Sequence, residues 1–131
     1  MKILVDTNVL LSSVIDNSQC YELLLQARSK HDIYYTAFIL AEFRYVLLNK
    51  FKLNISEISD IIKVIEEHYT KGESAKELIR VSRDKNDDHV LADALKNNIE
   101  VIITGDKDLL ILKSYHSIKI LSPVDFTKYY L

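Results

Sequence analysis

The sequence is poor in the residues that crosslink, break or kink a chain. It has one cysteine, one proline, two glycines and no tryptophan among 131 residues. A single cysteine excludes an internal disulfide, and Cys20 lies in an apolar helical pattern, so we interpret it as a packing residue rather than a nucleophile. The scarcity of proline and glycine leaves little room for long loops or linkers. We therefore expect one domain over residues 1–131.

Long apolar runs and an excess of positive charge are also lacking. Runs such as Val9-Leu10-Leu11 are far shorter than the roughly 20 residues of a bilayer-spanning helix. The N-terminus has a strand pattern without a signal-peptide pattern, so we expect a cytoplasmic protein with no membrane segment. The net charge of −2 gives no direct support for a nucleic-acid partner. It does not exclude one if several acids gather in one pocket.

Short strand patterns alternate with helical patterns along the chain. Strands are predicted at residues 2–5, 33–36, 78–81, 101–104 and 118–121, with 78–81 as a weak edge strand. Helices are predicted at 8–15, 19–30, 37–50, 56–70, 87–98, 105–113 and 124–130. Ser56 is the predicted cap of the fourth helix, and residues 16–18 are a predicted break. This alternation predicts an α/β fold with a mostly parallel central sheet flanked by helices.

Acidic residues follow two of the predicted buried strands. Asp6 comes directly after strand 2–5, and Asp106 and Asp108 follow strand 101–104, where Thr104 could add a hydroxyl. The carboxyl ends of strands are where open α/β sheets bind ligands. The alternative for each acid is a helix-capping role, since anionic side chains are favourable at a helix N-terminus.

Other acids lie on predicted helices. Glu42 has only apolar and aromatic neighbours three and four positions away, so it has no same-helix ion pair. A carboxylate in such surroundings is costly unless it is paired, protonated or metal-bound. A distant Arg or Lys could also satisfy it. The acids Asp84, Asp87, Asp88 and Asp93 are ambiguous, because one or two must cap the helix. The helical wheel favours Asp87 slightly over Asp88, and spacing does not settle the choice.

Together these acids predict a divalent metal site. Like charges held close together raise one another's pKa, so such a cluster persists only with a cation. Oxygen ligands favour Mg²⁺ or Mn²⁺ over zinc, and Mg²⁺ commonly shares its coordination with substrate phosphates. The expected chemistry is phosphodiester hydrolysis, with the metal activating a water and stabilising the leaving oxygen.

The same residues resemble the four acidic motifs of the PIN (PilT N-terminus) domain family, and within it the VapC-type toxins of toxin–antitoxin pairs. The resemblance covers essentially the whole chain. The matching stretches are Leu4-Val5-Asp6-Thr7-Asn8-Val9-Leu10, Ala41-Glu42-Phe43, Asp84-Lys85-Asn86-Asp87-Asp88-His89-Val90-Leu91-Ala92 and Thr104-Gly105-Asp106-Lys107-Asp108-Leu109-Leu110. Each motif alone is weak, but all four in this order are specific. Lys85 departs from the proline that relatives often carry there.

The resemblance implies a single PIN-like domain with a five-stranded sheet and Mg²⁺- or Mn²⁺-dependent cleavage of single-stranded RNA. It also implies a small antitoxin partner and a homodimer. The family register assigns the catalytic metal ligands, with Asp88 chosen over Asp87. The implied ligands are Asp6, Glu42, Asp88 and Asp106, with Asp108 as an accessory and Asn8 and Thr104 in support.

Basic residues near the motifs are candidates for holding the RNA backbone: Arg44, Arg83, Lys85 and Lys107. For each of them a solvent-exposed surface role is the alternative. Two other functions also fit parts of the pattern. A phosphoacceptor receiver domain shares the acids, but it needs a lysine at the end of the last strand, where this chain has Leu121-Ser122-Pro123. A non-catalytic module that binds RNA or protein could retain the same fold.

Overall fold

The fold is a six-stranded sheet with helices on both faces. The computed structural model describes residues 1–15, 19–77 and 79–131. The strands are β1 (Lys2–Val5), β2 (Asp32–Tyr35), β3 (Thr70–Lys71), β4 (Val101–Ile103), β5 (Ser114–Tyr115) and β6 (Ile118–Leu121). The helices are α1 (Thr7–Ile15), α2 (Gln19–Lys30), α3 (Ala37–Asn49), α4 (Ile55–His68), α5 (Lys85–Lys96), α6 (Lys107–Leu110) and α7 (Pro123–Tyr130). The predicted α/β class is confirmed.

The strand order β3-β2-β1-β4-β6-β5 places β1 and β4 at the centre. The pairs β1–β2, β1–β4, β2–β3 and β4–β6 are parallel, and only β5 runs antiparallel to its neighbour β6. The apolar residues of β1 and β4 are at most 1% exposed. Because both faces of these strands are buried, their residues are all apolar instead of alternating between apolar and polar.

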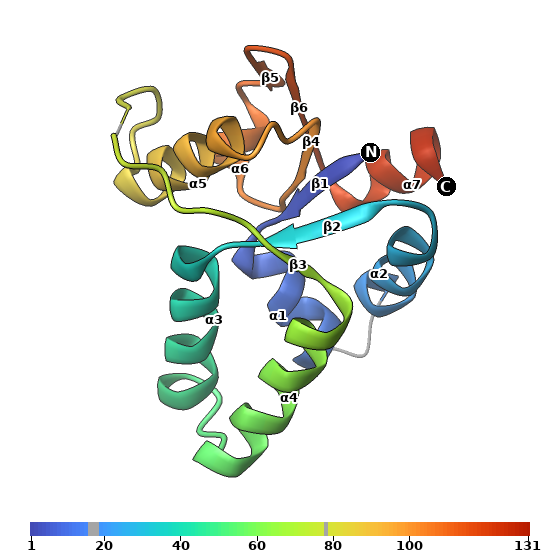
Figure 1. Ribbon diagram of the computed structural model, residues 1–131, viewed down its shortest axis with the longest axis vertical. Coiled ribbons are helices and arrows are strands. Elements are labelled where there is room, and N and C mark those ends of the chain that lie inside the picture. The colour runs from blue at the N-terminus through green and yellow to red at the C-terminus, as the bar shows by residue number, and fades with distance from the viewer. Residues whose placement is uncertain (16–18, 78) are drawn as a thin grey trace.

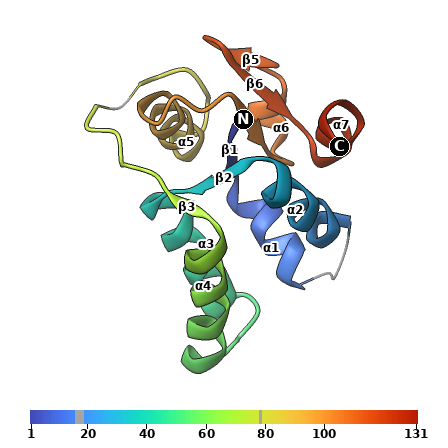
Figure 2. The ribbon, with the colours of Figure 1, turned by 45° about the vertical axis from the view of Figure 1, so that its right-hand side comes forward.

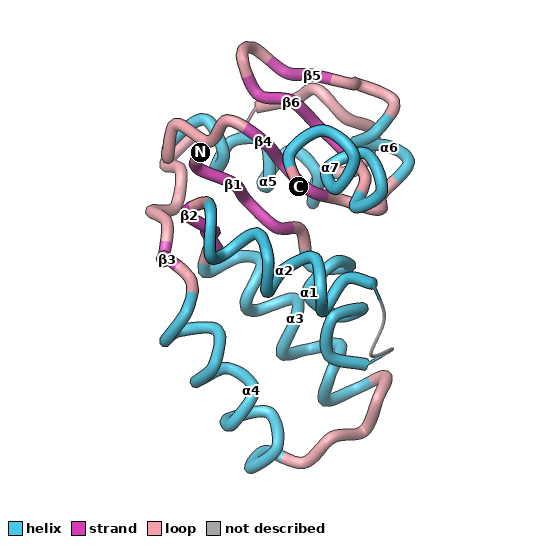
Figure 3. Tube along the Cα trace, turned by 90° about the vertical axis from the view of Figure 1, so that its right-hand side faces the viewer, coloured by secondary structure: helices cyan, strands magenta, loops and turns pink. Residues whose placement is uncertain are grey.

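The helices form a layer on each side of the sheet. Figure 2 shows α5 on one side of the central strands, with α1, α2 and α7 on the other. The helical hairpin of α3 and α4 projects away from the sheet (Figures 1 and 3). The fully buried Phe43 and Leu47 of α3 join the core shared with β1 and β4, and Ile58, Ile62 and Ile65 of α4 are also buried.

Two strand predictions need correction. Residues 79–81 are not a strand, and Leu78 lies outside the described residues, as does the predicted break at 16–18. The edge position that the sequence suggested for 78–81 is taken by β3, which pairs with β2 through Tyr34–Thr70 and Tyr35–Lys71. The short β5 adds a further strand at the opposite edge. Two-residue strands carry too little periodicity to be recognised from sequence. Five strands were therefore expected, whereas the described residues form six.

The N-terminal cap of α4 also differs from the prediction. Ser56 lies inside the helix, and Asn54 is the cap. The Asn54 side chain accepts a hydrogen bond from Glu57 N at 2.8 Å, and Glu57 Oε1 accepts one from Asn54 N at 3.1 Å. This reciprocal pair is a capping box. At the last helix, Ser122 caps α7 and Pro123 lies at its start.

Every helix among the described residues is too short or too polar for a bilayer crossing.

Candidate active site

The candidate site lies where the chain reverses its direction of progress across the sheet. From β1 the chain moves outward through β2 and β3, then returns to β4 on the other side of β1. Such a reversal opens a crevice at the carboxyl ends of the two central strands. Asp6 follows β1 there, and its amide donates to Ile103 O of β4 at 3.0 Å. Asp106 follows β4 and caps α6.

A pocket of about 200 Å³ at this position is lined by five carboxylates from four parts of the chain. Glu42 comes from α3, while Asp84 and Asp87 come from the start of α5. The lining residues are Asp6, Thr7, Asn8, Leu11, Glu42, Asp84, Asn86, Asp87, Val90 and Asp106. Three of the four predicted catalytic acids therefore line one pocket, namely Asp6, Glu42 and Asp106.

The Asp6 carboxylate is buried and held by several donors. Its Oδ2 accepts from Thr104 Oγ1 at 2.8 Å and from Asn8 Nδ2 at 3.3 Å, and its Oδ1 accepts from Thr7 N at 2.8 Å. Asn8 is fixed in turn, because its Oδ1 accepts from Gly105 N at 2.9 Å. Burial raises the pKa of Asp6 above its ordinary value, and the hydrogen bonds from Thr104 and Thr7 oppose that rise.

Glu42 is held without a basic partner among the described residues. Its Oε1 accepts from Thr7 Oγ1 at 2.8 Å, and its Oε2 accepts from Asn86 Nδ2 at 3.4 Å. The helix α3 that presents Glu42 begins at the capping residue Thr36, whose hydroxyl accepts from Ile39 N at 3.3 Å. The alternative of a distant Arg or Lys partner for this acid therefore has no support in the hydrogen bonds and ion pairs of the described residues.

Three acids form the tightest group in the pocket. Asp84, Asp87 and Asp106 each offer one carboxylate oxygen, and these oxygens lie within 4.8 Å of one another. Burial raises the pKa of Asp87 to about 7, with further contributions from hydrogen bonding to Asp106 and from the charges of Asp106 and Asp84. A hydrogen bond from Ser82 Oγ to Asp87 Oδ2 at 3.2 Å acts in the opposite direction.

Two acids that the family register assigned to the metal lie elsewhere. Asp88 is not part of the described pocket lining, and its Oδ1 accepts from Val81 N at 3.0 Å and Ser82 N at 2.8 Å. Adjacent helical residues point about 100° apart, and of this pair only Asp87 belongs to the described lining. Asp108 forms an ion pair with Arg83 at 3.1 Å and is also outside the described lining.

The four predicted basic residues do not converge on the carboxylates. Arg44 lines a different groove, between α3 and α4, together with apolar residues such as Leu48 and Ile58. The side chain of Arg83 is 89% exposed and pairs with Asp108. Lys85 and Lys107 are exposed at the first positions of α5 and α6, next to the pocket acids that cap those helices.

Sequence reasoning missed several polar residues that shape the pocket. Thr7 contacts Glu42, Asn86 contacts Glu42, and Ser82 contacts Asp87. The two residues of each of these hydrogen bonds lie 5 to 44 positions apart in the sequence. A local sequence pattern therefore does not predict the contacts. Asp84 stood among the ambiguous acids and is the N-cap of α5.

The donor chemistry of the pocket fits a hard divalent cation. Its acids offer only carboxylate oxygens, and its described lining contains no histidine or cysteine. Such a set favours Mg²⁺ or Mn²⁺ over softer metals. The pKa of Asp87 is raised by burial and by the neighbouring acids, and a cation would offset both effects. His89, adjacent to these acids, stacks on Phe38 at 4.5 Å between ring centroids rather than facing the pocket.

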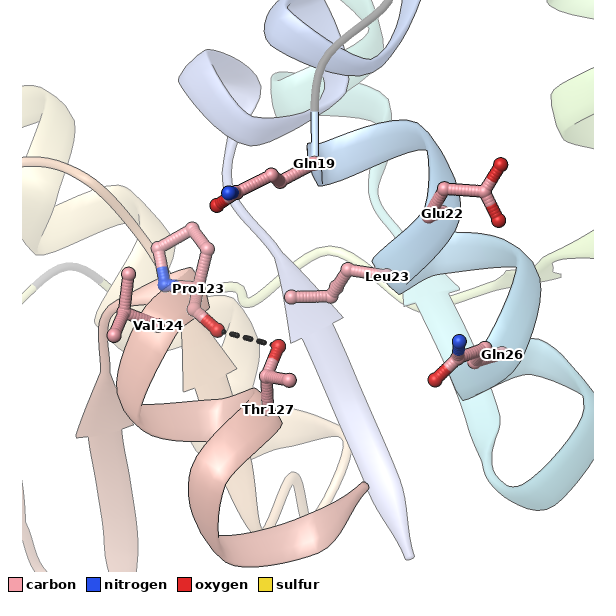
Figure 4. Close-up of a pocket in the computed structure, with 7 residues that line it drawn as sticks. All are labelled: Gln19, Glu22, Leu23, Gln26, Pro123, Val124 and Thr127. Carbon is pink, nitrogen blue, oxygen red and sulfur yellow. Dashed lines mark hydrogen bonds between the residues drawn. The ribbon is translucent and has the colours of Figure 1, made fainter.

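Another pocket shows a different chemistry. Figure 4 shows the surface hollow between α2 and α7, where Gln19 points toward Pro123 and Glu22 points away from it. Thr127 Oγ1 donates to the carbonyl oxygen of Pro123 at 2.9 Å. Glu22 is the only acid in its described lining, so this hollow does not offer a converging set of ligands.

Comparison with known proteins finds a match to one family and similar folds among solved structures. A model of the PIN domain family matches residues 2–108. The structure of VapBC2 from Rickettsia felis, bound to a DNA fragment from their promoter, matches with a TM-score of 0.69 and 14% identity. That match covers 93% of this chain and 98% of the other. PAE2754 from Pyrobaculum aerophilum matches with a TM-score of 0.62 and 17% identity, over 96% of this chain and 86% of the other. No curated protein sequence matches.

Proposed function

This chain belongs to the PIN domain family, and on that premise we propose that it is a metal-dependent endoribonuclease that hydrolyses phosphodiester bonds of single-stranded RNA. The observation that carries the proposal is the convergence of five carboxylates in one pocket at the carboxyl ends of β1 and β4. The family match leaves the receiver-domain alternative without support.

The proposed metal ligands are drawn from the pocket acids. Asp6, Glu42, Asp87 and Asp106 hold the ion, and Asp84 adds a further carboxylate beside Asp87 and Asp106. Mg²⁺ or Mn²⁺ bound there supplies Lewis-acid activation of water and stabilises charge that develops on the phosphate. Asp87 takes the place of Asp88 in this set, since Asp87 lines the pocket beside Asp84 and Asp106, whereas Asp88 is outside the described lining. Asp108 is left outside it because of its ion pair with Arg83.

The neighbouring polar residues keep these carboxylates in place. Thr104 and Asn8 orient Asp6, and Thr7 orients Glu42. Because each of these contacts fixes a ligand before the ion arrives, the pocket is preorganised for binding. For the RNA backbone, Arg83, Lys85 and Lys107 are the candidates near the pocket, whereas Arg44 belongs to the α3–α4 groove and is not included.

The biological setting is proposed as well. We expect the chain to be the toxin of a toxin–antitoxin pair, inhibited by a small antitoxin, and to act as a homodimer in the cytoplasm. The fold shared with the VapBC2 structure supports this setting. A short reading frame next to the gene, whose product copurifies with this protein, is the expected observation.

The catalytic part is tested with purified protein and a single-stranded RNA. We expect cleavage with Mg²⁺ or Mn²⁺ that EDTA abolishes. Asp6→Asn should reduce the rate by at least about 100-fold, since an impaired metal site loses several kcal/mol of charge stabilisation. Arg44→Ala is the matched control, and it should cleave at the wild-type rate because its side chain lies in a different groove.

Wild-type cleavage no faster than that of Asp6→Asn would contradict the catalytic proposal. It would favour the second candidate, a non-catalytic module that binds RNA or protein.

A further inference from the structure

Two consecutive acids at the start of α5 have different contacts. Asp87 is 4% exposed and Asp88 is 6% exposed, so both are buried. Asp87 faces the other pocket carboxylates, and one of its oxygens lies within 4.8 Å of those from Asp84 and Asp106. Asp88 turns instead toward the segment that precedes the helix. The pair therefore divides into one acid that faces the site and one that faces the backbone.

Asp88 fixes the backbone just before α5. Its Oδ1 accepts from Val81 N at 3.0 Å and from Ser82 N at 2.8 Å. Ser82 in turn donates its hydroxyl to Asp87 Oδ2 at 3.2 Å, and the same hydroxyl accepts from Asp84 N at 3.4 Å. A continuous set of contacts thus runs from Asp88 through the backbone and hydroxyl of Ser82 to the carboxylate of Asp87.

Other polar residues of α5 and its C-terminal end hold the preceding segment in the same way. Asp93 Oδ1 accepts from Ala75 N at 2.8 Å. The Asn97 side chain accepts from Glu73 N at 2.8 Å and donates to Glu73 O at 2.8 Å. Asp88 continues this series, in which side chains of the helix satisfy backbone groups of the segment beside it. Buried polar groups need such partners, and the contact explains why an acid is buried at position 88 without facing the pocket.

We propose that Asp88 is a positioning residue, which sets the Asp87 carboxylate through Ser82, rather than a metal ligand. This inference rests on the proposed function, since it takes Asp87 as a ligand of the ion. The two roles need different properties of residue 88. A positioning residue needs an acceptor oxygen at Oδ1, which asparagine keeps. A carboxylate ligand also contributes negative charge to the cation, which asparagine does not, so the substitution should weaken binding at a ligand position.

The test compares Mn²⁺ affinity, measured by titration, in the full-length wild type and four variants. We expect Asp87→Asn to lose at least about tenfold in affinity, and Asp88→Asn to lose less than about threefold. Asp88→Ala and Ser82→Ala should each lose about tenfold, the usual scale for residues that support ligands. Ser82→Ala also keeps the test decisive if Asp88→Ala does not fold.

Amide hydrogen exchange supplies a second measurement that reports on position 81–82 directly. Protection of the Val81 and Ser82 amides should persist in Asp88→Asn and Asp87→Asn and be lost in Asp88→Ala. The inference is overturned if Asp88→Asn loses Mn²⁺ as Asp87→Asn does while these amides stay protected, or if Ser82→Ala binds as the wild type does. A wild type that binds no Mn²⁺ would instead refute the proposed function, and this inference with it.

Discussion

At the scale of single residues, the ionisation of Asp87 is strongly altered. Its pKa is raised to about 7 by burial and by the neighbouring acids Asp106 and Asp84. Asp6 is shifted in the same direction, chiefly by burial. A raised pKa means that the folded protein binds a proton more tightly than the unfolded chain does. Without metal, these carboxylates therefore tend to bind a proton, and in the metal-bound protein a cation would take its place.

This shift predicts how stability depends on pH. The unfolded carboxyl group titrates near pH 3.9 and the folded one near 7, so the metal-free protein should become less stable as pH rises between about pH 4 and about pH 7. Thermal unfolding at about pH 5 and about pH 8, with metal removed, measures the effect. The Asp87→Asn variant should show a weaker dependence, because it loses the contribution of Asp87 and keeps that of Asp6.

Metal binding should show the opposite trend. A cation displaces the proton from Asp87, so Mn²⁺ affinity should rise by up to about tenfold per pH unit below the pKa of this group. Stability that rises with pH over the same window without metal, or an affinity that does not change with pH, would contradict this account of Asp87.

The sequence predicted the place of a side chain correctly where that side chain directly follows the end of a strand. Asp6 and Asp106 directly follow the central strands, and Glu42 stood out by its apolar neighbours. The same reasoning left Asp87 and Asp88 undecided. They are neighbours in sequence, so the helical pattern fits either of them. The structure separates them, because Asp87 lines the carboxylate pocket and Asp88 contacts the backbone of Val81 and Ser82.

At the scale of elements, α4 shows how a local signal can be misplaced by two residues. Ser56 is a good capping residue by type, but Asn54 and Glu57 together satisfy two backbone N–H groups. We expect Asn54→Ala to lower the free energy of unfolding by about 1 kcal/mol, since it removes the capping side chain. Urea unfolding measures the loss.

Ser56→Ala is the matched control for this prediction. Ser56 is exposed within the first turn of α4, so its removal should change the free energy of unfolding by less than about 0.5 kcal/mol. An equal or larger loss in Ser56→Ala would show that the cap lies at Ser56 after all.

At the scale of the whole molecule, the α3–α4 hairpin carries several exposed apolar side chains. It projects from the sheet (Figure 1) and carries Tyr45, Ile55 and Val64 at 65%, 79% and 51% exposure. The helix α3 has a largely apolar sequence, and among its described residues it buries only Ile39, Phe43 and Leu47. Exposed apolar side chains grouped on one hairpin support the proposed homodimer.

Self-association through this hairpin predicts a mass of two chains by light scattering. Ile55→Lys should convert the dimer to a monomer, because it places a charge on the exposed apolar face. Val124→Lys is the matched control: Val124 is also exposed, at 68%, but lies on α7. A monomeric wild type would contradict the homodimer, and dissociation by Val124→Lys alone would place the interface elsewhere.

The sequence by itself determined the α/β class, most helices, the central strands and the placement of Asp6 and Asp106 at their carboxyl ends. These features follow from local patterns, because burial on both faces makes a strand apolar and the strand's end fixes where the next side chain lies. Only the tertiary structure decided that Asp87 rather than Asp88 faces the carboxylates, that Thr7 and Asn86 hold Glu42, and that Arg44 lies in another groove. Those outcomes depend on which distant segments of the chain pack together. A helical pattern predicts the direction in which a side chain points, but it does not predict which residues that side chain contacts.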